Sequence, residues 1–378
     1  MKYIFITLVV LSISISMSSC KQRNQVGASL IGNPTFFRQT ELLYAQNFEI
    51  MENGIHIKMP WKGAPHGLFY TNNPIYESDS SRQLPFSLDR LVCLSTTHVS
   101  MLTALGQEDR IVGASNLNFI ESPKVRKLIE AKKIQEINNN GKLDIEKIIS
   151  LKPDMVIAYA INAEDCEPLD RLGIPVLYVS EFLEADPLGR AEWIKMFGAL
   201  LGKQEQANRF FSNTAGQYEA IKKFRWEDGW PKILVGSPFQ GKWYLPGAQS
   251  FLAQLIRDAG GDYKWMEQGG TASVILSLEE ILQQTSDADV WIDVGTVPDL
   301  ITLASNDERI KNIKAYRLGN VYNYSKRRSS GGGYAIFEEG VTEPHKVLQD
   351  LIKAFHPEDV PDQEFSYYEK LSNKSNNF

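Results

Sequence analysis

The 378-residue chain is poor in the residues on which several classes of protein depend. Its three cysteines are too few for a disulfide framework or a cysteine-ligated cluster. It also has only five histidines. Its formal net charge is −6 and no long basic block occurs, so nucleic acid is not an expected partner. Beyond the first twenty residues, no apolar run is long enough to cross a bilayer. No G-x-S-x-G elbow or Walker-type phosphate loop is present, which argues against enzymes that rely on those motifs.

The first twenty residues have the pattern of an export signal. Lys2 supplies the charged start, and residues 4–15 form the apolar segment that follows it. Residues 17–20 (MSSC) then place small residues before a cysteine, which resembles the lipobox of bacterial lipoproteins, with methionine in place of the commoner leucine. We therefore expect residues 1–20 to be a lipoprotein signal peptide and Cys20 to carry the lipid. A plain signal peptide is the alternative.

Residues 21–89 are expected to form a tether and a β-rich N-terminal extension. Residues 21–32 are polar, as flexible linkers are. Residues 48–59 alternate in hydrophobicity around Asn53 and Gly54, a pair that favours a tight hairpin turn. We expect this extension to pack on the first lobe of the fold.

Short apolar strands alternate with helical patterns in residues 90–186 and again in residues 225–378. This alternation predicts an α/β fold with two Rossmann-like lobes, each built on a mainly parallel sheet. Residues 236–246 are expected to be a loop within the second lobe. Ligands of such sheets bind beyond the carboxyl ends of the strands, so two facing lobes predict a ligand cleft between them.

One long helix over residues 187–224 is expected to join the lobes. Asp186 is suited to cap it, and Pro187 suits the first helical position because its missing N–H costs nothing there. Apolar residues recur behind that start at helical spacing, and the helix would be about 55 Å long. Glycines weaken it, and a break near Gly202 stays open.

Two glutamates occupy equivalent places in the two lobes. Residues 144–149 (DIEKII) and 277–282 (SLEEIL) each begin with an N-cap residue, an apolar residue and a glutamate. Glu146 and Glu279 therefore lie near the positive end of a helix dipole, which stabilises carboxylates. Because Glu280 completes the capping box with its N-cap serine, Glu279 is not needed for that box, and a second role is open to both glutamates.

Four segments together resemble the helical-backbone (class III) periplasmic substrate-binding proteins, the soluble receptors of ABC importers for ferric siderophores, haem and cobalamin. They are residues 91–115, 143–160, 241–263 and 276–293, and the resemblance covers about residues 90–355. It implies two lobes joined by a long helix. It also implies that Glu146 and Glu279 dock on arginines of the permease, with helix capping alone as the alternative.

Candidate ligand contacts lie on the loops that face the expected cleft. Aromatic side chains there suit a large planar ligand, and arginines suit carboxylates, catecholates or haem propionates. Packing of the aromatics within their loop, or solvated arginines, is the alternative. The candidates are Thr96, Thr97, His98, Asn116, Asn140, Tyr159, Trp243, Tyr244, Arg327, Arg328, Tyr334 and Phe337. Residues 329–333 (SSGGG) are expected to be a flexible segment that orders on binding, or a plain surface loop.

His98 is the one histidine on an expected cleft loop. It is a candidate to contact the ligand or bind haem iron, and a helix-start histidine bonded to backbone is the alternative. No cluster of histidines and carboxylates typical of a bare metal site is visible, so we expect a chelated metal as ligand and no resident metal or cofactor. Cys93 and Cys166 suit small buried hydrophobes, and a disulfide between them stays open.

The sequence thus predicts a lipid-anchored, monomeric binding protein of the cell envelope, on a periplasm-facing membrane. It would capture an iron chelate (siderophore or haem) or a corrinoid and deliver it to the permease and ATPase of an ABC importer. Two alternatives remain: an envelope lipoprotein of the same fold that binds ligand or partners without transport, and an enzyme on a nitrogenase-like two-lobe fold. The sequence does not choose among the chelates.

Overall fold

The computed structural model describes residues 37–73, 81–85, 87–139, 141–159, 166–222, 229–268, 270–305 and 307–373. The expected signal peptide, Cys20 and the tether lie outside the described residues, as does Asn140. The chain divides into Met1–Pro34 and a second unit, Thr35–Phe378, which holds all the elements below. Within the described part of the chain, no helix has the length and apolar character needed to cross a membrane.

The N-terminal extension contains a four-stranded sheet. Its strands pair in the order β1 (Phe48–Met51), β2 (Gly54–Ile57), β3 (Leu68–Thr71) and β4 (Ser81–Gln83). Strands β1 and β2 are antiparallel, with Phe48 opposite Ile57, so the hairpin predicted around Asn53 and Gly54 is confirmed. The apolar residues of this hairpin alternate toward a buried face, as the sequence pattern requires.

Lobe one, which we define as residues 90–186, is built on a five-stranded parallel sheet. The sheet order is β11 (Val176–Tyr178), β10 (Met155–Ala158), β5 (Leu91–Cys93), β6 (Ile111–Ala114) and β7 (Gln135–Glu136). Its helices are α1 (Thr96–Ala104), α2 (Pro123–Glu130), α3 (Ile145–Leu151) and α4 (Glu167–Arg171), with a small β8 (Asn138–Asn139) and β9 (Lys142–Leu143) pair and short turns η1 (Glu108–Arg110), η2 (Leu117–Phe119) and η4 (Glu181–Leu183). The buried thiols of Cys93 and Cys166 are not joined in a disulfide.

Lobe two, defined as residues 229–373, carries a second mainly parallel sheet. Its order is β12 (Ile233–Val235), β16 (Val290–Ile292), β17 (Val321–Asn323) and β18 (Glu369–Lys370), and only β18 runs antiparallel to its neighbour. Its helices are α8 (Phe251–Asp258), α9 (Leu278–Thr285), α10 (Leu300–Ser305), α11 (Lys314–Leu318), α12 (Ala335–Glu338) and α13 (Pro344–Phe355), with turns η5 (Glu308–Asn312) and η6 (Glu339–Val341). The mixed α/β architecture with mainly parallel sheets is therefore as predicted.

One part of lobe two differs from the sequence prediction. The expected loop over residues 236–246 is wrong, because β13 (Pro238–Phe239) and β14 (Lys242–Leu245) form a hairpin that continues into β15 (Val274–Leu276). The physical reason is the alternation along β14, where Trp243 and Leu245 are buried and Lys242 and Tyr244 are exposed.

The stretch between the lobes forms three helices in place of the single one expected over residues 187–224. They are α5 (Pro187–Glu192), α6 (Ile194–Leu200) and α7 (Gln204–Lys222). Gly202 has a φ of 65° and the N–H of Lys203 donates to the Gly198 carbonyl, a Schellman-type ending for α6. A Cβ on Gly198 would lie 2.5 Å from that of Ala207, so α7 turns back alongside α6.

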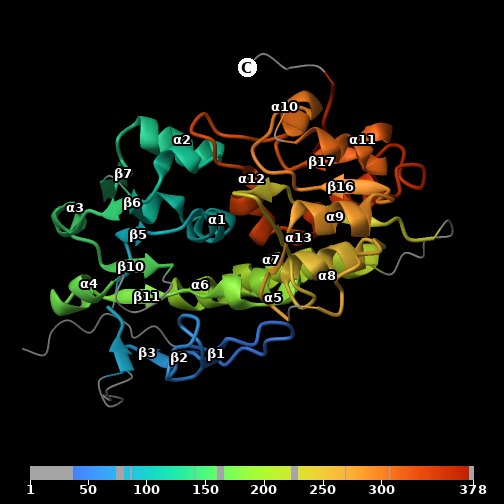
Figure 1. Ribbon diagram of the computed structural model, residues 1–378. Helices are drawn as coiled ribbons and strands as arrows, with labels where there is room; N and C mark the ends of the chain where they lie inside the picture. Colours follow the sequence, from blue (N-terminus) through green and yellow to red (C-terminus); the bar gives the residue numbers. More distant parts are fainter. Residues whose placement is uncertain are drawn as a thin grey trace, which may run out of the picture. The chain divides into compact units, whose positions relative to one another are not determined.

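The N-terminal extension packs on lobe one and on the connecting helices, as Figure 1 shows for β1 to β3 beneath α5 and α6. The buried carboxylate of Glu192 in α5 accepts the backbone N–H groups of residues 43–45 at 2.8–3.1 Å. The N–H of Tyr178 in β11 donates to the Tyr70 hydroxyl at 3.1 Å, and the rings of Phe48 and Trp193 lie 4.7 Å apart. The extension thereby braces the junction between lobe one and α5.

Candidate ligand-binding cavity

A cavity of about 340 Å³ lies where the two sheets face each other. Four of its lining residues follow the carboxyl ends of parallel strands: Ser95 after β5, Tyr159 after β10, Asp293 after β16 and Tyr324 after β17. This is the edge at which open α/β sheets bind ligands. The lining residues are Ser95, Thr96, Thr97, Tyr159, Glu181, Phe182, Pro187, Arg190, Phe251, Leu252, Leu255, Asp293, Tyr324, Ile336, Phe337, Gly340, Val341, Pro344, Val347 and Tyr368.

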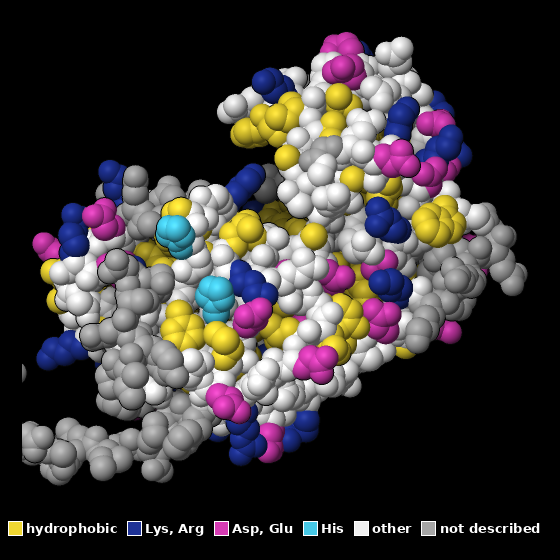
Figure 2. Space-filling view, turned by 90° about the horizontal axis from the view of Figure 1, so that it is seen from below, with side chains coloured by type: hydrophobic (Ala, Val, Ile, Leu, Met, Phe, Trp, Pro, Cys, Tyr) yellow, Lys and Arg dark blue, Asp and Glu magenta, His cyan; other side chains and the backbone are white. Residues whose placement is uncertain are grey.

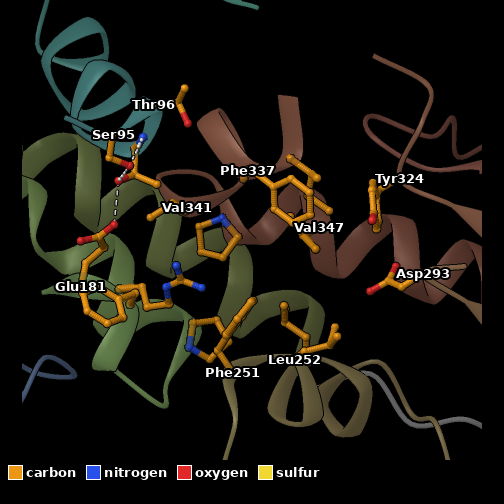
Figure 3. A pocket seen from close by; sticks show the side chains of 18 of the residues that line it. Ser95, Thr96, Glu181, Phe251, Leu252, Asp293, Tyr324, Phe337, Val341 and Val347 are labelled. Atoms are coloured by element: carbon orange, nitrogen blue, oxygen red, sulfur yellow. Dashed lines mark hydrogen bonds between the residues drawn. The ribbon is translucent and has the colours of Figure 1, made fainter. Parts of the chain in front are cut away.

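The middle of the cavity is apolar. Figure 3 shows Phe251 and Leu252 on one side of it and Phe337, Val341 and Val347 on the other. Helix α8 supplies the first pair, and α12, η6 and α13 supply the others. Such walls suit a ligand with an apolar or aromatic body, held in orientation by the few polar groups at the ends.

Glu181 marks one end of the cavity. Its side chain is buried, and its Oε1 accepts a hydrogen bond of 2.7 Å from the Thr97 hydroxyl. Its other oxygen, Oε2, has no hydrogen-bond partner among the described residues. Burial raises the pKa of Glu181, while the nearby Arg190 acts in the opposite direction. A buried carboxylate oxygen without a partner is costly, so it is available to a ligand donor.

Arg190, from the connecting helix α5, lies close to Glu181 at this end. Its guanidinium carbon is 4.1 Å from the centre of the Phe251 ring, a cation–π contact between the connecting helix and lobe two. Its buried Nε has no hydrogen-bond partner among the described residues. Burial lowers the pKa of Arg190, and the carboxylate of Glu181 opposes that shift. A stacked guanidinium with unused donors is suited to an acceptor or an anionic group on a ligand.

Asp293 lies at the opposite end from Glu181, below Tyr324 in Figure 3. Its backbone is left-handed with a φ of 59°, a conformation that aspartate tolerates better than most residues. The Tyr368 hydroxyl donates to its Oδ1 at 2.7 Å. Burial raises the pKa of Asp293 to about 6.

Among the sequence candidates, Thr96, Thr97, Tyr159 and Phe337 line the cavity. Tyr334 lies behind it, since its ring packs edge-on against Tyr324 and Phe337 at 5.0 and 6.2 Å. The lining groups Glu181, Arg190 and Asp293 were missed by sequence reasoning. Asp293 directly follows β16, whereas Glu181 and Arg190 carried no signal that distinguished them from surface residues.

Four further candidates, His98, Trp243, Asn116 and Tyr244, lie away from the cavity. His98 is fully buried in α1, with its ring 6.4 Å from that of Phe197, and burial lowers its pKa to about 3, so it is neutral at physiological pH. Trp243 is also fully buried; its indole N–H donates to the Val235 carbonyl at 2.7 Å and its ring stacks on Trp291. Asn116 and Tyr244 do not line the cavity either: Asn116 accepts a 3.4 Å hydrogen bond from Asn138, and Tyr244 is exposed on β14.

Arg327 and Arg328 do not line the cavity. Arg327 forms ion pairs with Glu339 of its own lobe and with Glu121 of lobe one. Arg328 lies over the Tyr334 ring, 5.5 Å from its centre. The glycine-rich segment 329–333 lies against lobe one, where the Ser329 hydroxyl donates to the Asn118 carbonyl at 2.6 Å. This part of the chain thus forms a contact between the lobes.

The two helix-start glutamates are both exposed. Asp144 caps α3 by accepting the N–H of Lys147, and Ser277 and Glu280 form the predicted capping box on α9. Glu279 pairs with Arg309 at 2.8 Å, and that hydrogen bond lowers its pKa. For Glu146, the described residues provide no ion-pair partner.

The described residues contain no group of three or more histidine, cysteine, aspartate or glutamate side chains that could hold a metal ion. On the face shown in Figure 2, acidic and basic side chains are intermixed among the coloured residues, with no continuous basic patch.

The sequence profile of the family described as "Periplasmic binding protein" matches residues 91–327. An uncharacterized lipoprotein of Methanocaldococcus jannaschii is 25% identical over 309 residues, which is 79% of this chain and 72% of that protein. An uncharacterized ABC transporter substrate-binding lipoprotein of Bacillus subtilis is 23% identical over 261 residues, covering 61% of this chain and 80% of that protein. A vitamin B12-binding protein of Vibrio parahaemolyticus is 26% identical over 145 residues, covering 37% of this chain and 50% of that protein.

Solved structures show the same fold. The periplasmic haem-binding protein of Vibrio cholerae superimposes with a TM-score of 0.55 at 16% identity, covering 69% of this chain and 99% of that one. A protein of the Fe³⁺-hydroxamate transport system of Saccharomonospora viridis gives a TM-score of 0.52 at 20% identity, covering 70% of this chain and 92% of that one. At these identities the likeness concerns the fold.

Proposed function

Because this chain belongs to the periplasmic binding protein family, whose members are solute-binding proteins and not enzymes, we propose that it captures a metal chelate in the cavity between its lobes. The chelate is a ferric siderophore, haem or a corrinoid, and the receptor delivers it to the permease of an ABC importer. The relatives whose names mention vitamin B12, haem or Fe³⁺-hydroxamate support this range of ligands.

The cavity itself is the observation that carries this proposal. It joins residues from the carboxyl ends of both sheets, and its polar groups at one end, Glu181 Oε2 and Arg190 Nε, have no partner among the described residues. Buried polar groups are normally satisfied, so their state fits a site that a ligand completes. Because the described residues offer no set of metal ligands, the metal would arrive within its own chelator.

The rest of the assignment follows the sequence. After removal of the signal peptide, an acylated Cys20 would anchor the protein in the cell envelope on a periplasm-facing membrane. The lipoprotein names of two relatives support this. Glu146 and Glu279, one on each lobe and both exposed, would meet arginines of the permease. The receptor would act as a monomer.

A ligand panel tests the proposal. The full-length protein in detergent is titrated with haem, cobalamin, cobinamide, a ferric trihydroxamate and a ferric tris-catecholate, while tryptophan fluorescence and visible absorbance are recorded. We expect saturable binding of at least one probe at micromolar or lower concentration. Arg190→Gln should weaken that binding, because it removes the guanidinium from the cavity. A wild-type protein that binds none of the probes would favour a lipoprotein without transport function.

A further inference from the structure

The two ends of the cavity differ in how their charges are balanced. At the first end, Glu181 and the guanidinium of Arg190 compensate each other. Among the described lining residues, Arg190 is the only one with a basic side chain. The pKa of Asp293 responds to burial and to Tyr368, and no basic group contributes to it. The second end of the cavity therefore carries a carboxylate without a compensating cation.

The fold holds the Asp293 carboxylate firmly in place. The residue directly follows β16, its N–H donates to the Tyr322 carbonyl of β17, and its left-handed backbone directs the chain away from the sheet. The Tyr368 hydroxyl fixes one oxygen, Oδ1. The other oxygen, Oδ2, accepts no hydrogen bond from the described residues, and the residue lines the cavity.

Tyr324 and Tyr368 are the other titratable groups at this end, and burial raises the pKa of both phenols. They are therefore neutral at physiological pH and can donate hydrogen bonds but carry no positive charge. Asp350, behind Tyr368, is a further carboxylate and is held by the backbone N–H groups of residues 366–368. An anionic group on a ligand would meet only acceptors and neutral hydroxyls here.

We propose that Asp293 determines ligand specificity by accepting a hydrogen bond from an N–H donor on the ligand, while Arg190 binds an acceptor at the other end. This rests on the proposed function and narrows its ligand class. Metal chelates rich in amide groups and without net negative charge, such as corrinoids, fit both ends. Chelates that are anionic over their whole rim, such as ferric tris-catecholates, are rejected because Asp293 repels them.

Asp293→Asn is the variant that isolates this effect. Asparagine has the same size and tolerates the left-handed backbone as well as aspartate does, so the variant removes the charge and keeps the fold. Its amide oxygen still accepts a hydrogen bond, though a weaker one. Asp362→Asn makes the same chemical change at an exposed site that does not line the cavity, and it serves as the control.

The experiment measures Kd for cobinamide and for a ferric tris-catecholate with the wild type and both variants at about pH 7.5. We expect the wild type to prefer cobinamide by roughly 100-fold, the size of effect that one like-charge contact produces. Asp293→Asn should reduce that preference at least about tenfold, chiefly by strengthening catecholate binding. Asp362→Asn should leave it unchanged, and melting temperatures near that of the wild type verify folding.

Lowering the pH gives a second, independent measurement. Because the pKa of Asp293 is about 6, its carboxylate is ionised at pH 7.5 and largely protonated near pH 5. The wild-type preference should therefore fall on acidification, and the part due to Asp293 should be absent in Asp293→Asn. Any fall that remains in the variant comes from groups other than Asp293, among them Glu338, whose pKa is raised to about 7, and the catecholate ligand itself.

The outcomes separate the two proposals. A wild type that binds the tris-catecholate as tightly as cobinamide, or a preference that Asp293→Asn leaves intact, overturns the role of Asp293 and leaves the proposed function standing. A wild type that binds neither these two probes nor the rest of the panel overturns the proposed function, and the role of Asp293 fails with it.

Discussion

Arg327 of lobe two forms an ion pair with Glu121 of lobe one and, at the same time, with Glu339 at 2.6 Å in its own lobe. The neighbouring Glu338 accepts the N–H groups of Glu121 at 2.7 Å and Ser122 at 3.3 Å. We call residues 327–339 the interlobe clasp. Because α5, α6 and α7 join the lobes elsewhere, the clasp is a second connection between them and limits how far they separate.

Gly331→Ala should weaken the clasp. A Cβ at this position would lie 2.5 Å from the Asn118 carbonyl oxygen of lobe one, so the segment must move away. We expect the free energy of unfolding, measured in urea, to fall by about 1–3 kcal/mol, the usual cost of overpacking. The release of ligand, followed by stopped-flow fluorescence, should become faster.

The matched control is Gly216→Ala in helix α7, where an added Cβ meets nothing within 4 Å. Alanine favours the helix there by up to about 1 kcal/mol, so this variant should be slightly more stable than the wild type. Equal effects of the two substitutions would show that the clasp does not constrain the lobes.

Glu338 makes the clasp sensitive to pH. Burial raises its pKa to about 7, and the nearby carboxylates of Glu121 and Glu339 act in the same direction. Arg327 pairs with both of those carboxylates. Below the pKa of this side chain in the unfolded state, near 4.5, both states are protonated at this site. There the folded state has the full stabilisation that the raised pKa contributes.

As the pH rises from about 4.5 to 7, the unfolded state releases this proton while the folded state retains it, so stability is lost over that window. Glu338→Gln removes the effect. The free energy of unfolding of the wild type, measured in urea at several pH values, should fall relative to that of the variant across this range. Parallel curves for the two proteins would contradict the assignment.

The sequence predicted the features that depend on local chemistry. The turn at Asn53 and Gly54, the cap at Asp186 and the alternation of strands and helices all follow from neighbouring residues, and the structure contains them. The sequence did not decide whether the helix ends at Gly202. A glycine inside a helix and a glycine that ends one in a Schellman motif look alike in sequence, and the packing of α7 against α6 distinguishes them.

The cavity was less accessible to sequence reasoning. A charged residue at a helix start is ordinarily solvated, so nothing in the sequence indicated that folding buries Glu181 and places the half-buried Arg190 against Phe251 of lobe two. His98 illustrates the converse, since it begins a helix at the expected edge of the sheet but turns into the core. Whether a side chain faces the cavity or the core depends on the rotation of its helix and on contacts between the lobes. The pattern of a single strand or helix does not encode either.

Glu192 is predicted to hold the N-terminal extension. Its buried carboxylate accepts the N–H groups of residues 43–45 and pairs with Lys195 at 2.7 Å. Glu192→Ala leaves Lys195 without its carboxylate partner and frees these N–H groups, which should cost about 3–5 kcal/mol. Hydrogen exchange should show the loss of protection concentrated in residues 43–57.

The control for that experiment is Glu205→Ala in helix α7. Glu205 lies 3.8 Å from Arg209 and both side chains are exposed, so this pair should contribute no more than about 0.5 kcal/mol. Similar losses in the two variants would mean that the Glu192 carboxylate does not anchor the extension.

The proposed docking glutamates yield the last prediction. Glu146→Ala combined with Glu279→Ala should abolish uptake in cells while the Kd for ligand stays unchanged, because neither side chain lines the cavity. Exposed glutamates elsewhere, changed together as Glu130→Ala and Glu205→Ala, should leave uptake intact.

The two proposed docking sites are not equivalent. Glu279 must exchange its Arg309 partner for a cation of the permease, whereas the described residues give Glu146 no such competitor. Arg309→Gln should therefore strengthen binding to the permease in nanodiscs, most clearly at low salt, where surface charges are least screened. Weaker binding of Arg309→Gln to the permease would make Arg309 part of the contact and not a competitor of it. Normal uptake by the double glutamate variant would remove the docking role from both glutamates.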